Sequence, residues 1–220
     1  MQIREKLYRF MPKHGGGMEI FMVGIIDYKA GNGPSVQNAL EHLGIESVLT
    51  SDKSELASCS HIILPGVGSA GATMTSLREI DVIGTLEEHV FNKKRPFMGI
   101  CVGLQVLFER SEEESANCLG WLGGDVVRFD EAKVRVPQIG WNSAEFVKDS
   151  DILSGLGKEE YFYFVNSYHI RPKEDIALAY TDYGGRFCSM IQKGNIYASQ
   201  FHIEKSGEIG LRLLKNFANL

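Results

Sequence analysis

The chain has 220 residues, of which 44% are hydrophobic and 23% are charged, and this composition excludes a largely disordered protein. Its 23 Lys and Arg residues against 28 Asp and Glu residues give a formal net charge of −5, which argues against nucleic-acid binding as the main role because phosphate contacts need clustered cations. The length predicts one domain, and no apolar run is long enough to span a bilayer.

The first 21 residues differ from the rest of the chain. They carry several basic side chains and the triplet Gly15-Gly16-Gly17, but no apolar core of the length that a signal peptide needs. We expect residues 1–21 to be a flexible N-terminal extension and the folded domain to cover residues 22–220.

The first half of the domain alternates buried strands with helices. The apolar patterns predict strands at residues 22–27, 45–49, 61–64 and 96–100, and helices at residues 34–43, 83–91 and 102–110. Such alternation is typical of a parallel sheet covered on both faces. The sequence therefore predicts an α/β fold with a mostly parallel open sheet and helices on both faces.

The second half has a different pattern. Short strand-like segments are separated by turn residues, and they lie at residues 126–129, 143–147, 161–165, 176–180, 188–192 and 196–200. We expect them to add an antiparallel or mixed region to the sheet, with Tyr161, Phe162 and Phe164 in its core. An amphipathic helix at residues 208–217 ends the chain.

The most informative motif is Gly99-Ile100-Cys101-Val102-Gly103, at a predicted strand-to-helix junction. It is the thiol counterpart of the nucleophile elbow, a turn that exposes its central side chain over the carboxyl end of a sheet. We predict that Cys101 is a nucleophile, favoured as a thiolate by the helix N-terminus, and that the Val102 N–H is an oxyanion donor.

A thiol nucleophile needs a base, and His202 is the leading candidate. It directly follows a predicted strand, and Glu204 lies two residues further on. In extended backbone, residues i and i+2 point to the same side, so Glu204 is expected to orient the His202 ring.

A glycine-rich loop, Gly66-Val67-Gly68, follows the strand at residues 61–64 and could supply a second oxyanion donor. A phosphate-binding loop is the competing interpretation, and it is weak because no Gly-Lys-Ser/Thr sequence follows.

Other polar residues have simpler interpretations. His42 and His89 are expected on solvated helix faces, and Glu112, Glu113 and Glu114 at a solvated helix end. The remaining cysteines, at positions 59, 118 and 188, are expected to be inert small hydrophobic side chains. Four cysteines with no C-x-x-C spacing predict neither a zinc site nor a disulfide scaffold, and they favour a reducing, cytoplasmic setting.

Together, the elbow, the glycine loop and the tail at residues 200–206 resemble the triad glutamine amidotransferases of class I. Four further segments, at residues 26–32, 137–142, 161–168 and 210–217, resemble the glutaminase subunits of imidazole glycerol phosphate synthase. The resemblance runs from about residue 22 to the end of the chain.

The resemblance implies that Cys101, His202 and Glu204 hydrolyse glutamine through a thioester and release ammonia. It implies that Val102 and the Gly66-Val67-Gly68 loop hold the oxyanion, and that Gln105, Ser167 and Tyr168 bind glutamine. Ammonia would pass to a (βα)8-barrel cyclase subunit, with an interface at Asn32, Trp141, Tyr163 and Lys205. No metal and no organic cofactor is implied.

The sequence departs from that family at three places. Ile203 stands where proline is usual, and we expect its β-branched side chain to keep the backbone extended. Asn166 replaces a usual histidine, and Gly33-Pro34 is unusual beside the predicted interface.

Several functions stay open at this stage. The first is the glutaminase of histidine biosynthesis. The second is a paralogous glutaminase that feeds a different synthase, such as one that forms an amidine on a surface sugar. The third is a non-catalytic regulatory subunit, and a stand-alone cysteine peptidase is the fourth.

Overall fold

The computed structural model describes residues 10–12, 18–29 and 31–220. The expected flexible extension falls largely on residues 1–9 and 13–17, which lie outside the described residues, so its flexibility stays a prediction. Two short strands of this region, β1 (Phe10–Pro12) and β2 (Met18–Ile20), pair antiparallel.

Five strands form the parallel part of a 13-stranded sheet, in the order β4-β3-β5-β6-β15. They are β3 (Val23–Ile26), β4 (Ser47–Thr50), β5 (His61–Gly66), β6 (Phe97–Cys101) and β15 (Ile196–Ser199). Every residue of the four inner strands β3, β5, β6 and β15 is buried, as expected where helices cover both faces. The predicted parallel sheet is confirmed.

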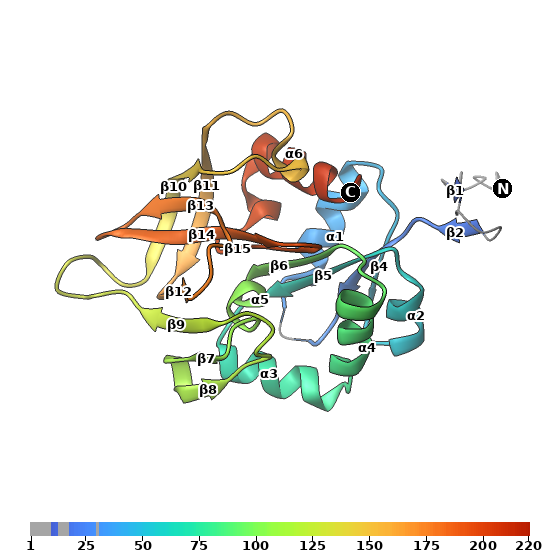
Figure 1. The fold of residues 1–220 in the computed structure, drawn as a ribbon, viewed down its shortest axis with the longest axis horizontal. Coiled ribbons are helices and arrows are strands. Elements are labelled where there is room, and N and C mark those ends of the chain that lie inside the picture. Colours follow the sequence, from blue (N-terminus) through green and yellow to red (C-terminus); the bar gives the residue numbers. More distant parts are fainter. Residues whose placement is uncertain (1–9, 13–17, 30) are drawn as a thin grey trace.

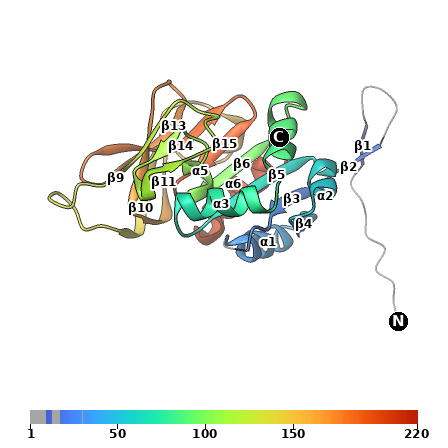
Figure 2. The same cartoon turned by 90° about the horizontal axis from the view of Figure 1, so that it is seen from below.

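Helices cover this part of the sheet on both faces. Figures 1 and 2 show α1 (Gly33–His42) and α6 (Gly207–Phe217) on one face, and α2 (Lys53–Ser58), α3 (Ala70–Glu79) and α4 (Ile83–Glu87) on the other. No helix formed by the described residues is long and apolar enough to cross a membrane.

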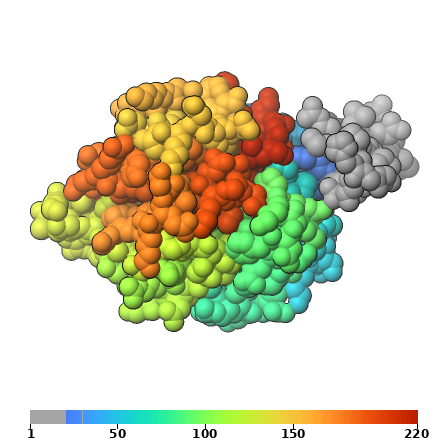
Figure 3. All heavy atoms as spheres, viewed as in Figure 1, coloured from blue at the N-terminus to red at the C-terminus, as the bar shows by residue number. Residues whose placement is uncertain are grey.

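The second half adds the predicted antiparallel region. Beyond β15 the sheet continues through β14 (Arg186–Lys193), β12 (Tyr168–Pro172), β9 (Gly124–Arg128), β7 (Arg110–Ser111) and β8 (Ala116–Asn117). A branch leads from β14 through β13 (Ala177–Asp182) and β10 (Gln138–Phe146) to β11 (Glu159–Asn166). In the space-filling view, the yellow and orange segments of this half pack directly on the remainder of the molecule (Figure 3).

The helix predicted for residues 102–110 is shorter than expected, because α5 (Val102–Gln105) ends after four residues. The backbone beyond it bonds to a distant segment: the Leu119 N–H donates to Val106 O at 2.9 Å, and the Leu122 N–H donates to Leu107 O at 2.9 Å. These tertiary bonds replace the helical ones, and a local pattern could not reveal them.

Two side-chain predictions were wrong. His89 is buried, because it follows buried Leu86 by three residues on the same face of the helix, which continues from α4 as a π-helical turn, η1 (Glu88–Asn92). Tyr161 is exposed, because it points to the opposite face of β11 from Phe162 and Phe164, which are fully buried as predicted. His42 is exposed, as predicted.

The acidic run at residues 112–114 is not a plain solvated helix end. It includes a 3-10 turn, η2 (Glu113–Ser115), packed at the N-terminus of α3. There the Ala70 N–H donates to Glu113 Oε2 at 2.8 Å, and the Ser69 hydroxyl donates to Glu114 Oε2 at 3.0 Å. Carboxylates at a helix N-terminus are stabilising, so this run supports α3, a helix that the sequence analysis missed.

Two buried histidines make the fold sensitive to acid. Burial is the main cause that lowers the pKa of both His61 and His89 to about 4. The folded pKa therefore lies below the unfolded value of about 6.5, so the unfolded state binds more protons. The contribution of the two neutral histidines to the free energy of unfolding is therefore fully present above about pH 6.5. It is lost as the pH falls toward 4.

We predict that His89→Gln weakens this acid sensitivity while its amide can still bond to Pro96 O, which lies 3.1 Å from His89 Nε2. Between pH 7 and pH 5 the free energy of unfolding should fall by about 2 kcal/mol less in the variant than in the wild type. Urea unfolding at both pH values measures this. The exposed His42→Gln is the control and should behave as the wild type does; an unchanged pH dependence in His89→Gln would contradict the assignment.

Candidate functional site

Cys101 lies at the last position of β6, where the chain turns sharply into α5. Its backbone has φ 56° and ψ −110°, a left-handed region that a residue with a side chain rarely adopts. The strained turn places Cys101 at the carboxyl edge of the parallel strands. The predicted elbow is therefore confirmed in its backbone geometry.

Glycines permit this turn because neighbouring backbones approach closely. A Cβ at Gly103 would lie 2.0 Å from Leu64 O, and one at Gly66 would lie 2.4 Å from the Gly103 nitrogen. A Cβ at Gly99 would lie 2.4 Å from Gly103 O. No side chain fits at these three positions without moving the backbone.

His202 and Glu204 meet as the sequence predicts, but by a different local geometry. His202 Nδ1 lies 2.8 Å from Glu204 Oε1, and the Glu204 side chain is fully buried. The expected extended backbone at Ile203 is wrong, because Ile203 begins a 3-10 turn, η4 (Ile203–Lys205). The Lys205 N–H donates to His202 O at 3.1 Å and closes the turn, which brings residues 202 and 204 together.

The His202 ring lies between a sulfur and a carboxylate. Burial lowers its pKa, but hydrogen bonds to Cys101 and Glu204 and the charges of both groups outweigh burial and raise the pKa to about 10. The imidazole is therefore a strong proton acceptor beside the Cys101 thiol. This is the arrangement that activates a thiol nucleophile.

A cavity of about 250 Å³ opens beside these groups. Its lining includes the predicted residues Val67, Gly68, Cys101, Val102, Gln105, Ser167, Tyr168 and His202. Members of the predicted catalytic, oxyanion and substrate-binding sets thus meet around one space. Two predicted residues, Gly66 and Glu204, are not part of the lining; Gly66 pairs with Cys101 across β5 and β6.

Two further residues of this site were not predicted from the sequence. Glu113 lines the cavity, and burial is the main cause that raises the pKa of its carboxyl. Gln200 is fully buried, and its Nε2 donates to Cys101 Sγ at 3.7 Å while its Oε1 accepts from Gln105 Nε2 at 3.0 Å. For Gln200, its place two residues before His202 was an available signal, whereas Glu113 reaches the cavity only through tertiary folding.

Gln105 is also held from a second side, because its Nε2 lies 3.2 Å from Tyr168 O. Asn166 Nδ2 donates to the same Tyr168 O at 3.0 Å. The Ser167-Tyr168 backbone is therefore fixed at the cavity wall by two amide side chains.

The loop that carries Gly66, Val67 and Gly68 is anchored by Tyr28. The buried Tyr28 hydroxyl donates to Pro65 O at 2.7 Å. Burial is the main cause that raises the pKa of Tyr28 to about 12, so this phenol stays a donor at neutral pH.

The four predicted interface residues lie in two settings. Trp141 and Tyr163 face each other across β10 and β11, with ring centroids 6.1 Å apart. Lys205 is exposed directly after Glu204. Asn32 is half-buried, and its Nδ2 donates to Glu204 Oε1 at 2.7 Å.

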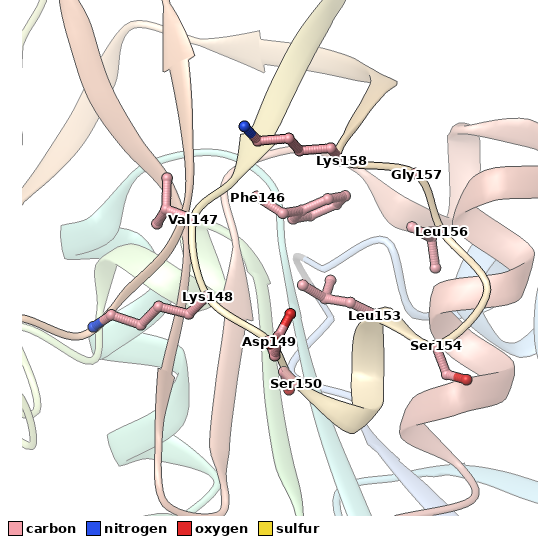
Figure 4. Close-up of a pocket in the computed structure, with 10 residues that line it drawn as sticks. All are labelled: Phe146, Val147, Lys148, Asp149, Ser150, Leu153, Ser154, Leu156, Gly157 and Lys158. Atoms are coloured by element: carbon pink, nitrogen blue, oxygen red, sulfur yellow. The ribbon is translucent and has the colours of Figure 1, made fainter.

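A larger groove lies elsewhere and differs in chemistry. Its volume is about 630 Å³, and the connection from β10 to β11 lines it (Figure 4). The labelled side chains include Lys148, Asp149 and Lys158 around apolar residues, but no cysteine or histidine. The smaller cavity beside Cys101 is therefore the candidate active site.

Nothing among the described residues suggests a metal centre, since no three His, Cys, Asp or Glu side chains within residues 10–12, 18–29 and 31–220 are grouped to hold an ion. The cysteines in this part of the chain are all free.

One known protein family covers almost the whole chain. The family model of class-I glutamine amidotransferases matches residues 24–219. The chain belongs to this family.

Among relatives of this amidotransferase chain are imidazole glycerol phosphate synthase subunits HisH. This chain is 44% identical over 203 residues to the HisH subunit of Methanocaldococcus jannaschii, and the match covers 90% of this chain and 100% of the relative. It is 45% identical over 200 residues to that of Rhodopirellula baltica, covering 90% and 97%.

Solved structures agree on the fold. PurLQS from Thermotoga maritima is similar with a TM-score of 0.73 and 20% identity, covering 90% of this chain and 98% of that one. A crystal structure of a glutamine amidotransferase is similar with a TM-score of 0.71 and 23% identity, covering 90% and 99%.

We predict that a glutamine-like chloroketone labels Cys101 and spares the other cysteines in the folded protein. Burial is the main cause that raises the pKa of Cys59 and Cys118 to about 11 and that of Cys188 to about 12, so these thiols stay protonated. Peptide mapping after brief labelling at pH 7.5 measures the selectivity. Cys101→Ser is the control and should take up no label, and preferential labelling of the half-exposed Cys118 would contradict the prediction.

Proposed function

We propose that the chain is the glutaminase subunit of an imidazole glycerol phosphate synthase. It hydrolyses glutamine to glutamate and ammonia and passes the ammonia to a separate cyclase subunit. The observation that carries this proposal is Cys101 on a strained elbow, in contact with the His202–Glu204 pair at the edge of a small cavity.

The first half-reaction forms a thioester. Cys101 Sγ attacks the side-chain carbonyl carbon of glutamine, and His202 takes the thiol proton. His202 then gives that proton to the leaving nitrogen, so the C–N bond breaks and ammonia departs. The Glu204 carboxylate holds the ring in place and stabilises its cationic form.

The second half-reaction hydrolyses the thioester. His202 takes a proton from water, and the water oxygen attacks the acyl carbon. The C–S bond then breaks, glutamate forms, and the sulfur leaves as a thiolate that receives the proton held by His202. In both halves a negative charge develops on the carbonyl oxygen. The Val102 N–H and an N–H of the Gly66-Val67-Gly68 loop are the proposed donors to that oxygen.

Recognition of glutamine needs partners for its amino and carboxylate groups. The Glu113 carboxylate lies in the cavity wall and is the proposed partner of the substrate ammonium. Gln105 and the Ser167-Tyr168 backbone complete the proposed binding set, in the positions that their hydrogen bonds fix.

The proposed partner surface is the β10–β11 patch, formed by Ile139, Trp141, Tyr161, Tyr163 and Val165 on one face of the hairpin. Trp141 is 58% exposed and Ile139 is 65% exposed, which is unusual for large apolar side chains that gather on one surface. Such a patch fits a protein partner, for which we propose a (βα)8-barrel cyclase that makes imidazole glycerol phosphate and aminoimidazole carboxamide ribotide. Asn32 and Lys205 are proposed to complete this interface.

The same strand connects the patch to the site. Cys101 Sγ lies 3.8 Å from the backbone carbonyl oxygen of Val165, and the backbone N–H of His202 donates to Tyr163 O at 2.9 Å. Docking on the patch would therefore be felt at both groups, and we propose that the partner activates glutamine hydrolysis. A cytoplasmic location is proposed with it, from the sparse use of cysteine.

The alternative functions, a regulatory subunit and a paralogous glutaminase, have different requirements for the residues of the site. A regulatory subunit needs no reactive thiol, whereas the His202–Glu204 pair and Cys101 are intact here. A paralogous glutaminase would have the same site with a different synthase, and the identity of 44–45% to HisH subunits supports the histidine pathway.

We predict that Cys101→Ala abolishes glutamine hydrolysis while a complex with the cyclase still turns over when ammonia is supplied. Loss of the nucleophile removes covalent catalysis, so the glutamine-dependent rate should fall by at least about 10³-fold. Glutamate release and ammonia-dependent cyclase turnover are measured on the same complex.

The wild-type protein tests the proposed activation by the partner. Equal rates of glutamine hydrolysis by the chain alone, with the cyclase, and with the cyclase and its ribulosyl ligand would argue for a stand-alone hydrolase.

We predict that Trp141→Ala weakens binding of the cyclase by about 10-fold or more. Large aromatic side chains at the centre of an interface often carry much of its binding energy. Titration calorimetry with the purified cyclase measures the dissociation constant. Phe91→Ala removes an exposed aromatic ring from the π-helical turn and is the control; equal effects of the two variants would contradict docking on the β10–β11 patch.

A further inference from the structure

Asn32 directly precedes α1 but does not cap it. An asparagine at this position normally accepts a hydrogen bond from the second or third N–H of the helix. Here the Asn32 side chain makes no such bond, and it turns away from the helix toward Glu204. The helix loses a usual stabilising contact, so the amide has another structural role.

Ser35 fixes which way the amide points. The Ser35 hydroxyl donates to Asn32 Oδ1 at 2.7 Å, and Asn32 Nδ2 donates to Glu204 Oε1 at 2.7 Å. The reverse amide orientation would place an oxygen against a carboxylate, which is repulsive, so the network allows one orientation.

Glu204 depends on this donor. Its side chain is fully buried, and Oε1 accepts from both His202 Nδ1 and Asn32 Nδ2. Oε2 is buried and has no hydrogen-bond partner among the described residues. A buried carboxylate needs hydrogen bonds to offset the loss of water, and Asn32 supplies the one that does not come from His202 itself.

We propose that Asn32 is a positioning residue of the glutaminase reaction, held by Ser35, which fixes and stabilises the Glu204 carboxylate that orients His202. This role rests on the proposed function and differs from the partner contact that the family resemblance implies for Asn32. Asn32 does not line the cavity beside Cys101, and its Nδ2 bonds to Glu204, so it acts through that carboxylate.

The test compares Asn32→Ala, Asn32→Asp and Ser35→Ala in the isolated chain and in the complex with the cyclase. Loss of one hydrogen bond to a charged group should lower kcat for glutamine hydrolysis by about 10-fold in Asn32→Ala, with KM unchanged. Asn32→Asp should lose more, because it sets a second carboxylate against Glu204, and Ser35→Ala should lose less, because Asn32 keeps its donor.

A matched control separates positioning from folding. Asn216, in the last turn of α6, donates its Nδ2 to Ile152 O and Ser154 O at 2.8 Å. Asn216→Ala also removes an amide donor, and we expect it to lower thermal stability without lowering kcat.

The outcomes separate three possibilities. An equal fall in kcat for Asn32→Ala in the isolated chain and in the complex supports the proposal. Unchanged kcat in both states, with weaker binding of the cyclase, overturns it in favour of an interface role alone. A wild-type chain that hydrolyses no glutamine with the cyclase present would instead refute the proposed function.

Discussion

The close approach of three backbone segments at the Cys101 turn is the constraint on which the site depends. Gly66 on β5, Gly99 on β6 and Gly103 on α5 are each packed so tightly that a single added carbon would overlap a backbone atom. That packing holds Cys101 in a left-handed conformation that it would not adopt alone. The strain is maintained because the parallel strands on both sides of β6 are fully buried and cannot move apart.

Strand β11 connects the proposed partner surface to the candidate active site. Its side chains alternate, so Tyr161, Tyr163 and Val165 face outward while Phe162 and Phe164 fill the core. Its backbone carbonyls bond inward to Cys101 and to the N–H of His202. A partner that shifts this strand would move both groups, and the cavity wall at Val165 with them, which gives the proposed activation a direct physical route.

Helix and loop ends supply much of the polar structure around the cavity. Glu113 accepts a hydrogen bond from the N-terminus of α3 and also lines the cavity. Asn32 precedes α1 without capping it and donates its hydrogen bond to Glu204 instead. In both cases a residue at a helix end connects the scaffold to the site. The fold and the candidate chemistry therefore share individual side chains, and a change that affects one is expected to affect the other.

The sequence by itself determined the elements whose signals are local. Continuous apolar runs predicted the buried parallel strands, the spacing of glycines around Cys101 predicted the turn, and the short distance along the chain from His202 to Glu204 predicted their pairing. The pairing was right although the backbone at Ile203 is a 3-10 turn, because two residues apart is close in either conformation.

Only the tertiary structure decided what depends on contacts between distant segments. Helix α5 ends early because residues 106 and 107 bond to residues 119 and 122, and His89 is buried where its Nε2 lies 3.1 Å from Pro96 O. Asn32 and its hydrogen-bond partner Glu204 are 172 positions apart along the chain. No periodicity or motif encodes such a separation, because it is fixed by how helices and loops pack at the carboxyl edge of the sheet.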